Sequence, residues 1–158
     1  MNICGYQISW EQIAYRIQQF RSVCLPVIDE QLRREAVSLL PESWRTPFRQ
    51  LPGSTLAHVL RLYKAIRDDP SLEAEERKSL ILLALTHDLG KAITRPTLFE
   101  RVVKVLLPLP NRSHVIAGAK LLKKLGAPAT LVWQIRNHHD HSGNDPLLIK
   151  FQTFDDRL

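Results

Sequence analysis

The sequence lacks any apolar stretch long enough to cross a membrane. A transmembrane helix needs about 18 or more consecutive apolar residues, whereas the longest apolar run here, from Leu80 to Leu85, has the length of a buried helix segment. The amino terminus shows no basic segment followed by an apolar one, so it predicts no secretory signal. The two cysteines, Cys4 and Cys24, do not make a disulfide framework and fit a reducing compartment. These absences predict a cytoplasmic protein without a membrane partner.

Acidic residues are fewer than basic ones. The chain has 22 lysines and arginines against 16 aspartates and glutamates, which gives a formal net charge of +6 and a pI near 9.6. This balance favours anionic partners such as nucleotides, other phosphoesters, nucleic acid or an acidic protein. The basic residues are spread from Arg16 to Arg157 without interleaved aromatic residues, which argues against a dedicated nucleic-acid surface. They either bind a small phosphate-bearing substrate or coat solvated helix faces.

Strand-like alternation and internal repeats are absent as well, and the hydrophobic spacing is helical nearly everywhere. With 158 residues, 44% of them hydrophobic, the chain can bury the core of one domain. We predict an all-α, single-domain bundle of seven or eight helices. Ser54 or Thr55 is expected to cap one helix, and another is expected to stop at Gly90. The expected helices cover about residues 9–24, 28–40, 55–68, 73–90, 98–106, 113–125 and 129–139, with a short helix or turn in 41–53 and a last helix from 147.

All six histidines fall between His58 and His141. Each of the first four lies on, or at the end of, a different expected helix, and a bundle brings such positions together in its interior. His87 and Asp88 follow an apolar helix, where a buried carboxylate is costly without a strong partner such as a metal ion. A single buried histidine is more often a hydrogen-bonded core residue than a ligand. The whole set of imidazoles and carboxylates, however, suits divalent iron, manganese, cobalt, nickel or zinc.

Five segments place these histidines and aspartates in a particular order. They are Thr55-Leu-Ala-His58-Val-Leu-Arg61, Leu82-Leu-Ala-Leu-Thr-His87-Asp88-Leu-Gly90-Lys91, His114-Val-Ile-Ala-Gly118-Ala119, Ile135-Arg-Asn-His138-His139 and Phe151-Gln-Thr-Phe-Asp155-Asp156. This order resembles the HD-domain superfamily of metal-dependent phosphohydrolases, in its small bacterial single-domain type. The resemblance implies that residues 51–158 form a metal-binding catalytic domain. Residues 1–50 carry no motif of the family and are expected to be an N-terminal helical extension packed on that domain.

The resemblance also implies a first metal site. Its ligands would be His58, His87, Asp88 and one of the two C-terminal aspartates. Helix periodicity favours Asp155, because it lies on the inward face of the last helix. A gapless comparison with some relatives favours Asp156 instead.

A second metal ion is implied by the remaining histidines. His114 and His138 match the additional histidines of those members that hold two ions, and His139 could replace or supplement His138. His141 lies in a polar loop and is expected to be exposed to solvent. The expected cofactor is therefore one divalent ion or two.

The implied reaction is attack of a metal-activated water on phosphorus in a nucleotide or a related small phosphate. Asp88 would bind metal and orient or deprotonate the water, and Lys91 would neutralise charge on the phosphate. Lys91 could instead interact with a helix C-terminus. Arg61 is a weaker phosphate-binding candidate, with a solvated surface arginine as its alternative. The segment after His139 lacks the Gly-Tyr-Pro signature of the cyclic-dinucleotide branch, so small nucleotide-cleaving members, including dinucleoside polyphosphate hydrolases, are the nearer comparison.

Two other functions remain open from the sequence. Some relatives on the same scaffold hold two irons and carry out oxygen-dependent cleavage, and others are non-catalytic modules that bind nucleotides or proteins. The N-terminal aromatic residues Trp10, Trp44 and Phe48 either cover the core of the bundle itself or form an interface with a partner, including a homodimer.

Overall fold

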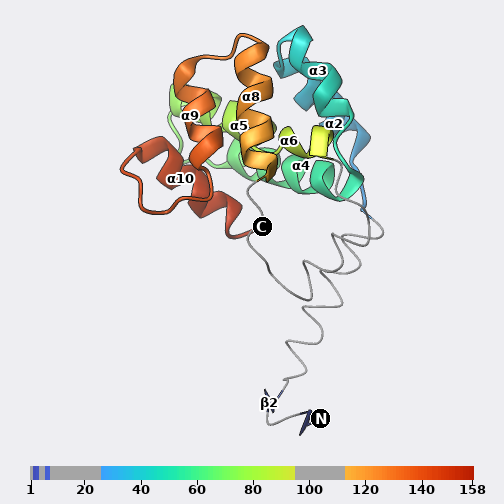
Figure 1. Cartoon of the computed structure of the whole chain (residues 1–158), viewed down its shortest axis with the longest axis vertical. Coiled ribbons are helices and arrows are strands. Elements are labelled where there is room, and N and C mark those ends of the chain that lie inside the picture. Colours follow the sequence, from blue (N-terminus) through green and yellow to red (C-terminus); the bar gives the residue numbers. More distant parts are fainter. Residues whose placement is uncertain (1, 4–5, 8–25, 95–112) are drawn as a thin grey trace.

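The computed structural model describes residues 2–3, 6–7, 26–94 and 113–158 and confirms the all-α architecture (Figure 1). Two short strands, β1 (Asn2–Ile3) and β2 (Tyr6–Gln7), pair in an antiparallel manner. The expected helices over 9–24 and 98–106 lie outside the described residues. The described helices are α2 (Glu30–Leu39), α3 (Glu42–Arg49), α4 (Gly53–Asp68), α5 (Ala74–Thr86), α6 (Gly90–Thr94), α8 (Ser113–Lys124), α9 (Ala129–Asn137) and α10 (Pro146–Asp155).

Side-chain caps define the starts of α2 and α10. The carboxylate of Asp29 accepts a hydrogen bond from the Leu32 amide at 2.9 Å, and Asp145 does the same for Leu148 at 2.7 Å. The sequence predicted that Ser54 or Thr55 caps α4, and this prediction was wrong. The helix already begins at Gly53. The residue before it, Pro52, has the extended backbone that a capping position needs, with ψ 142°.

One hydrophobic core joins the described helices. The buried side chains of α2 and α3 belong to the same cluster as those of α4, α5, α8, α9 and α10. Trp44 and Phe48 are among them, with 4% and 0% of their surfaces exposed. The indole N–H of Trp44 also donates to the Leu125 carbonyl, 3.3 Å away at the end of α8. Trp44 and Phe48 therefore cover the bundle's own core, while Trp10 lies outside the described residues.

A buried polar group reinforces the packing of α2 on α4. The hydroxyl of Tyr63 donates to the Glu35 carboxylate at 2.6 Å, and Arg67 pairs with the other carboxylate oxygen at 2.8 Å. Burial of Tyr63, together with this negative neighbour, raises the pKa of its phenol to about 12. The phenol therefore stays a neutral hydrogen-bond donor at neutral pH.

The chain does not leave the bundle at Gly90, where the sequence predicted the end of a helix. It makes a turn at residues 87–89 and continues as the short helix α6, which lies against α8 (Figure 1). The contact is a backbone contact. A Cβ atom on Gly90 would lie 1.8 Å from the His114 carbonyl oxygen and 2.6 Å from the Gly118 nitrogen. Glycine at position 90 thus allows α8 to approach closely enough to bring His114 beside Asp88.

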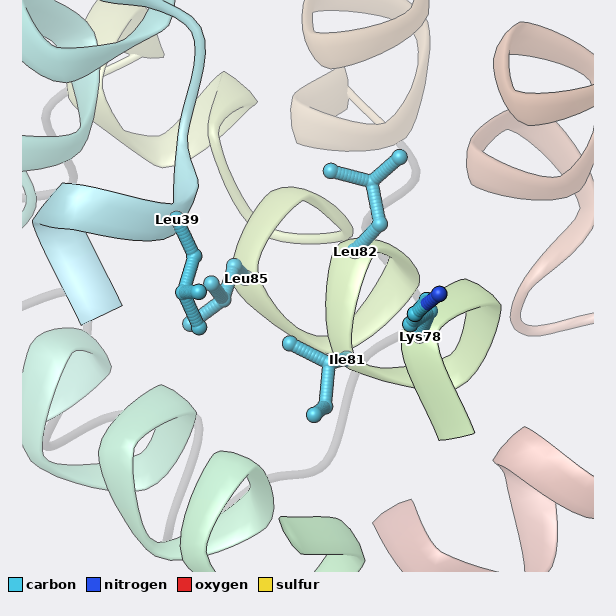
Figure 2. Close-up of a pocket in the computed structure, with 5 residues that line it drawn as sticks. All are labelled: Leu39, Lys78, Ile81, Leu82 and Leu85. Atoms are coloured by element: carbon cyan, nitrogen blue, oxygen red, sulfur yellow. The ribbon is translucent and has the colours of Figure 1, made fainter. Parts of the chain in front are cut away.

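The surface of α5 carries an apolar pocket of about 270 Å³ (Figure 2). Its lining consists of Leu39 from α2 together with Lys78, Ile81, Leu82 and Leu85 from α5. None of the histidines or aspartates singled out by the sequence belongs to it. None of the described helices is long and apolar enough to cross a membrane.

Candidate metal centre

The ends of several helices converge on one group of imidazoles and carboxylates. His58 comes from α4, and His87 and Asp88 directly follow α5. His114 comes from the first turn of α8, His138 and His139 follow α9, and Asp155 ends α10. His87 and Asp88 are each 2% exposed and His138 is 1% exposed. The bundle therefore brings together six of the residues that the sequence singled out as metal-ligand candidates, and His139 with them.

The first part of the group contains His58, His87 and Asp155, whose ligand atoms all lie within 4.8 Å of one another. The Nε2 atom of His58 lies 2.8 Å from Asp155 Oδ1, and His87 Nε2 lies 3.9 Å from the same oxygen. Asp156 points elsewhere, since its side chain is 65% exposed and its Oδ2 atom lies 4.0 Å from His141 Nδ1. Asp155 is therefore the C-terminal aspartate that faces the cluster.

The second part contains His114, His138 and His139, whose ligand atoms also lie within 4.8 Å of one another. His114 Nε2 and His139 Nε2 are 3.2 Å apart, and the rings of His138 and His139 have centroids separated by 4.0 Å. His138 is buried, whereas His139 is exposed at the edge of the group. The structure thus places His139 next to His138, where it supplements His138 and does not replace it.

Asp88 connects the two parts. One carboxylate oxygen, Oδ2, lies 3.5 Å from His87 Nε2, and the other, Oδ1, lies 3.6 Å from His114 Nε2. A carboxylate in this position can offer one oxygen to each of two cations. This arrangement is typical of two-metal sites in which a carboxylate is shared.

Two backbone carbonyls fix the orientation of the buried imidazoles. His87 Nδ1 lies 2.9 Å from the Ala84 carbonyl, and His138 Nδ1 lies 2.7 Å from the Ile135 carbonyl. Because a carbonyl can only accept, Nδ1 must carry the hydrogen in both rings, which leaves the Nε2 lone pair directed into the group. Histidines that bind metals are usually held by such outer hydrogen bonds.

Two atoms of the group are buried without a hydrogen-bond partner among the described residues. They are His138 Nε2 and Asp88 Oδ1. An unpaired lone pair costs about 1–3 kcal/mol when buried, and more on a charged group. Both atoms belong to residues that border the space between the two parts. A divalent cation there would satisfy both, so the donor set fits the metal that the sequence led us to expect.

The electrostatic environment holds these groups in the protonation states that a metal needs. Burial lowers the pKa of His114 to about 3 and that of His138 to about 4, against the opposing influence of the Asp88 charge. Burial alone would raise the pKa of Asp88, but Lys91 and His87 hold it well below its usual range. At neutral pH, His114 and His138 are therefore neutral imidazoles and Asp88 is a charged carboxylate, as metal binding requires.

These shifts predict that the metal-free protein loses stability as the pH falls from 7 to 5. The folded pKa of His138, about 4, lies below the unfolded value of about 6.5. Between these values only the unfolded chain binds the proton, so the stability is present above pH 6.5 and is lost toward pH 4. We expect the shift at His138 alone to lower the free energy of unfolding by about 2 kcal/mol between pH 7 and pH 5. Urea unfolding at both pH values would measure this change. In the His138→Gln protein, the free energy of unfolding should differ less between the two pH values. An equal difference in both proteins would contradict the lowered pKa of His138.

The predicted phosphate-binding residues differ in their placement. Lys91 Nζ lies 2.6 Å from Asp88 Oδ2, and its side chain is 28% exposed. It therefore pairs with a carboxylate of the group, in place of the alternative interaction with a helix terminus. Arg61 is exposed on α4, and no described contact links it to the group. His141 is exposed, as expected, with 59% of its side chain accessible.

Sequence reasoning missed two residues of α10 that contact the group. The ring of Phe151 packs against His87, with centroids 5.3 Å apart. The side-chain amide of Gln152 donates to the carbonyl of His138 at 3.1 Å and to that of Asp140 at 2.9 Å. The residue types alone do not signal either contact, because both depend on how α10 packs against its neighbours.

Comparison with known proteins gives one match. A sequence model described as HD domain matches residues 55–156, a range that contains every residue of both parts of the group. No curated protein and no solved structure matches the chain.

Proposed function

The chain belongs to the HD-domain family, and from this premise we propose that it is a metal-dependent phosphohydrolase. The substrate we propose is a nucleotide or a related small phosphate, cleaved at a phosphoester or phosphoanhydride bond. The observation that carries the proposal is the Asp88 carboxylate, which lies between two histidine groups and has one buried oxygen with no hydrogen-bond partner among the described residues. The formal charge of +6 would also attract anionic substrates.

The geometry supports two cation positions that share Asp88. We assign His58, His87, Asp88 and Asp155 to the first. For the second, we assign His114, His138 and Asp88, with His139 as an additional ligand. The imidazole and carboxylate donors suit divalent iron, manganese, cobalt, nickel or zinc. The distances within each part, none above 4.8 Å between ligand atoms, are small enough for one ion each after modest side-chain movement.

Divalent ions in these positions would lower the pKa of a bound water and polarise the phosphoryl oxygens. The residues of the chain supply the remaining functions. The fixed, charged carboxylate of Asp88 can accept a hydrogen bond from the attacking water and so orient it. Lys91, whose Nζ atom lies 2.6 Å from Asp88 Oδ2, can stabilise charge that develops on the phosphate. His139 is exposed and therefore accessible to a substrate.

The proposal predicts bound metal and metal-dependent hydrolysis. Protein purified without a histidine tag or chelator should contain up to two divalent ions per chain by elemental analysis. It should hydrolyse members of a panel of nucleotides and dinucleoside polyphosphates. A chelator should abolish turnover, and Mn²⁺ or Fe²⁺ should restore it, because the ions supply the activated water.

Three other outcomes would contradict this function in different ways. Turnover that requires both iron and molecular oxygen would identify an oxygenase on the same scaffold. Nucleotide or protein binding without metal, even after reconstitution, would identify a non-catalytic module. Bound metal without hydrolysis of any phosphoester in the panel would overturn the proposed substrate class. An anaerobic assay separates the first outcome from the proposed hydrolysis.

A further inference from the structure

Gln152 is a buried polar residue that has no place in either ligand set. It is 5% exposed and lies on α10, three residues before Asp155. Both of its described hydrogen bonds reach across to the end of α9. The Nε2 atom donates to the His138 carbonyl at 3.1 Å and to the Asp140 carbonyl at 2.9 Å.

The first of these carbonyls, that of His138, lies where a helix leaves its backbone acceptors without partners within the helix. Helix α9 ends at Asn137, and His138 is its C-terminal cap. The last carbonyls of a helix have no donor within the helix and need one from elsewhere. The Gln152 amide serves the carbonyl of the cap residue, His138, and that of Asp140, two residues beyond it, so that its two acceptors lie on either side of His139. The backbone that carries His138 and His139 is therefore fixed by a side chain of another helix.

The same helix also contacts the first part of the metal centre. Phe151 packs against the ring of His87, and Asp155 Oδ1 lies 2.8 Å from His58 Nε2. Within two helical turns, α10 thus supports ligands of both parts. The position of α9 relative to α10 determines how far His138 and His139 stand from Asp88 and Asp155.

We infer that Gln152 is a positioning residue that holds His138 and His139 in place and thereby sets the affinity of the second cation position. The inference rests on the proposed function where it concerns metal binding. Gln152 does not touch the reacting atoms. It acts through the backbone of the two histidines, as outer hydrogen bonds do in other metal sites.

A matched control exists on α9. Gln134 is also buried, at 8% exposure, and its amide donates to the Asp145 carboxylate at 3.2 Å. It therefore connects α9 to the start of α10 without contacting a histidine carbonyl. If buried glutamines merely stabilise the loop, replacing either one should have the same effect.

The test compares Gln152→Leu with Gln134→Leu by titrating Mn²⁺ into metal-free protein. For Gln152→Leu we expect one Mn²⁺ position, the second one with His114 and His138, to lose about 10- to 100-fold in affinity, while the other stays unchanged. For Gln134→Leu we expect both positions to resemble the wild type. Gln152→Glu, which keeps the shape but loses the donors when ionised, should repeat the result if the leucine protein does not fold. Equal losses at both positions, or no loss at either, would overturn the inference.

A second measurement needs no metal. In metal-free protein, the imidazole ¹⁵N signals of His138 and His139 should shift in Gln152→Leu, while those of His58 should not. If the wild-type protein binds no divalent ion at all, the proposed function fails, and the imidazole signals alone decide whether Gln152 positions the histidines. Unchanged signals of His138 and His139 in a folded variant would exclude this role.

Discussion

Asp88→Asn is expected to lower phosphohydrolase turnover by about 10³-fold or more, since removing one preorganised electrostatic group typically costs 10² to 10³. The change keeps the shape of the side chain but removes its charge. Asp88 faces His87 with one oxygen and His114 with the other, at 3.5 and 3.6 Å. In asparagine, one of these oxygens becomes an NH₂ group, which cannot bind a cation. One of the two proposed positions therefore loses its ligand, and the other keeps only a neutral carbonyl oxygen in place of a charged one.

The measurement compares kcat/KM and metal content of Asp88→Asn with those of the wild type. Asp156→Asn is the matched control, because this neighbouring carboxylate is 65% exposed and faces away from the group. It should retain both metal and turnover. Circular dichroism would establish that each variant is folded. A folded Asp88→Asn protein with wild-type metal content and wild-type turnover would refute the assignment of Asp88.

The sequence predicted the helical scaffold better than the connections between helices. Apolar periodicity located α4, α8, α9 and α10 to within a few residues, because each helix buries one face. The structure of residues 87–94 was harder to predict. The sequence predicted a stop at Gly90, but this residue serves a close backbone contact with α8 and begins α6. A glycine permits both roles, and the sequence alone does not distinguish them.

Proximity within the metal centre depends on long-range packing that no local pattern encodes. His58 and Asp155 are separated by 97 positions in the chain and lie 2.8 Å apart. The periodicity of α10 favoured Asp155 over Asp156, and the exposure of Asp156 agrees with that reasoning. The division of the ligands into two parts that share Asp88 could not be read from their order. It follows from the directions in which the rings point, which for His87 and His138 are determined by backbone carbonyls of α5 and α9.

Gln152 shows the same limit more clearly. Its partners are two backbone carbonyls, and any residue type would supply these atoms. Nothing in the residue types at positions 138 and 140 therefore signals the contact. Only the three-dimensional relation between α9 and α10 makes this glutamine different from one on a solvated face.

Gly90→Ala is expected to destabilise the protein by about 3 kcal/mol or more, at the upper end of the range for overpacked sites. By helix propensity alone, alanine would be favoured over glycine by about 1 kcal/mol. The contact reverses that preference. The new Cβ would lie 1.8 Å from the His114 carbonyl oxygen and 2.6 Å from the Gly118 nitrogen. Both atoms belong to the backbone of α8, so no side-chain rotation can relieve the overlap, and the two helices must separate.

The free energy of unfolding of Gly90→Ala, measured with urea, would test this expectation. Gly143→Ala provides the control, because no atom lies within 4 Å of the position that its Cβ would take, and its stability should change by less than about 0.5 kcal/mol. Any folded fraction of Gly90→Ala should also bind the second cation more weakly, since His114 moves with the backbone of α8. If Gly90→Ala unfolded at the same midpoint concentration of urea as the wild type, α6 and α8 would not be in backbone contact. The close approach of His114 to Asp88 would then need another cause.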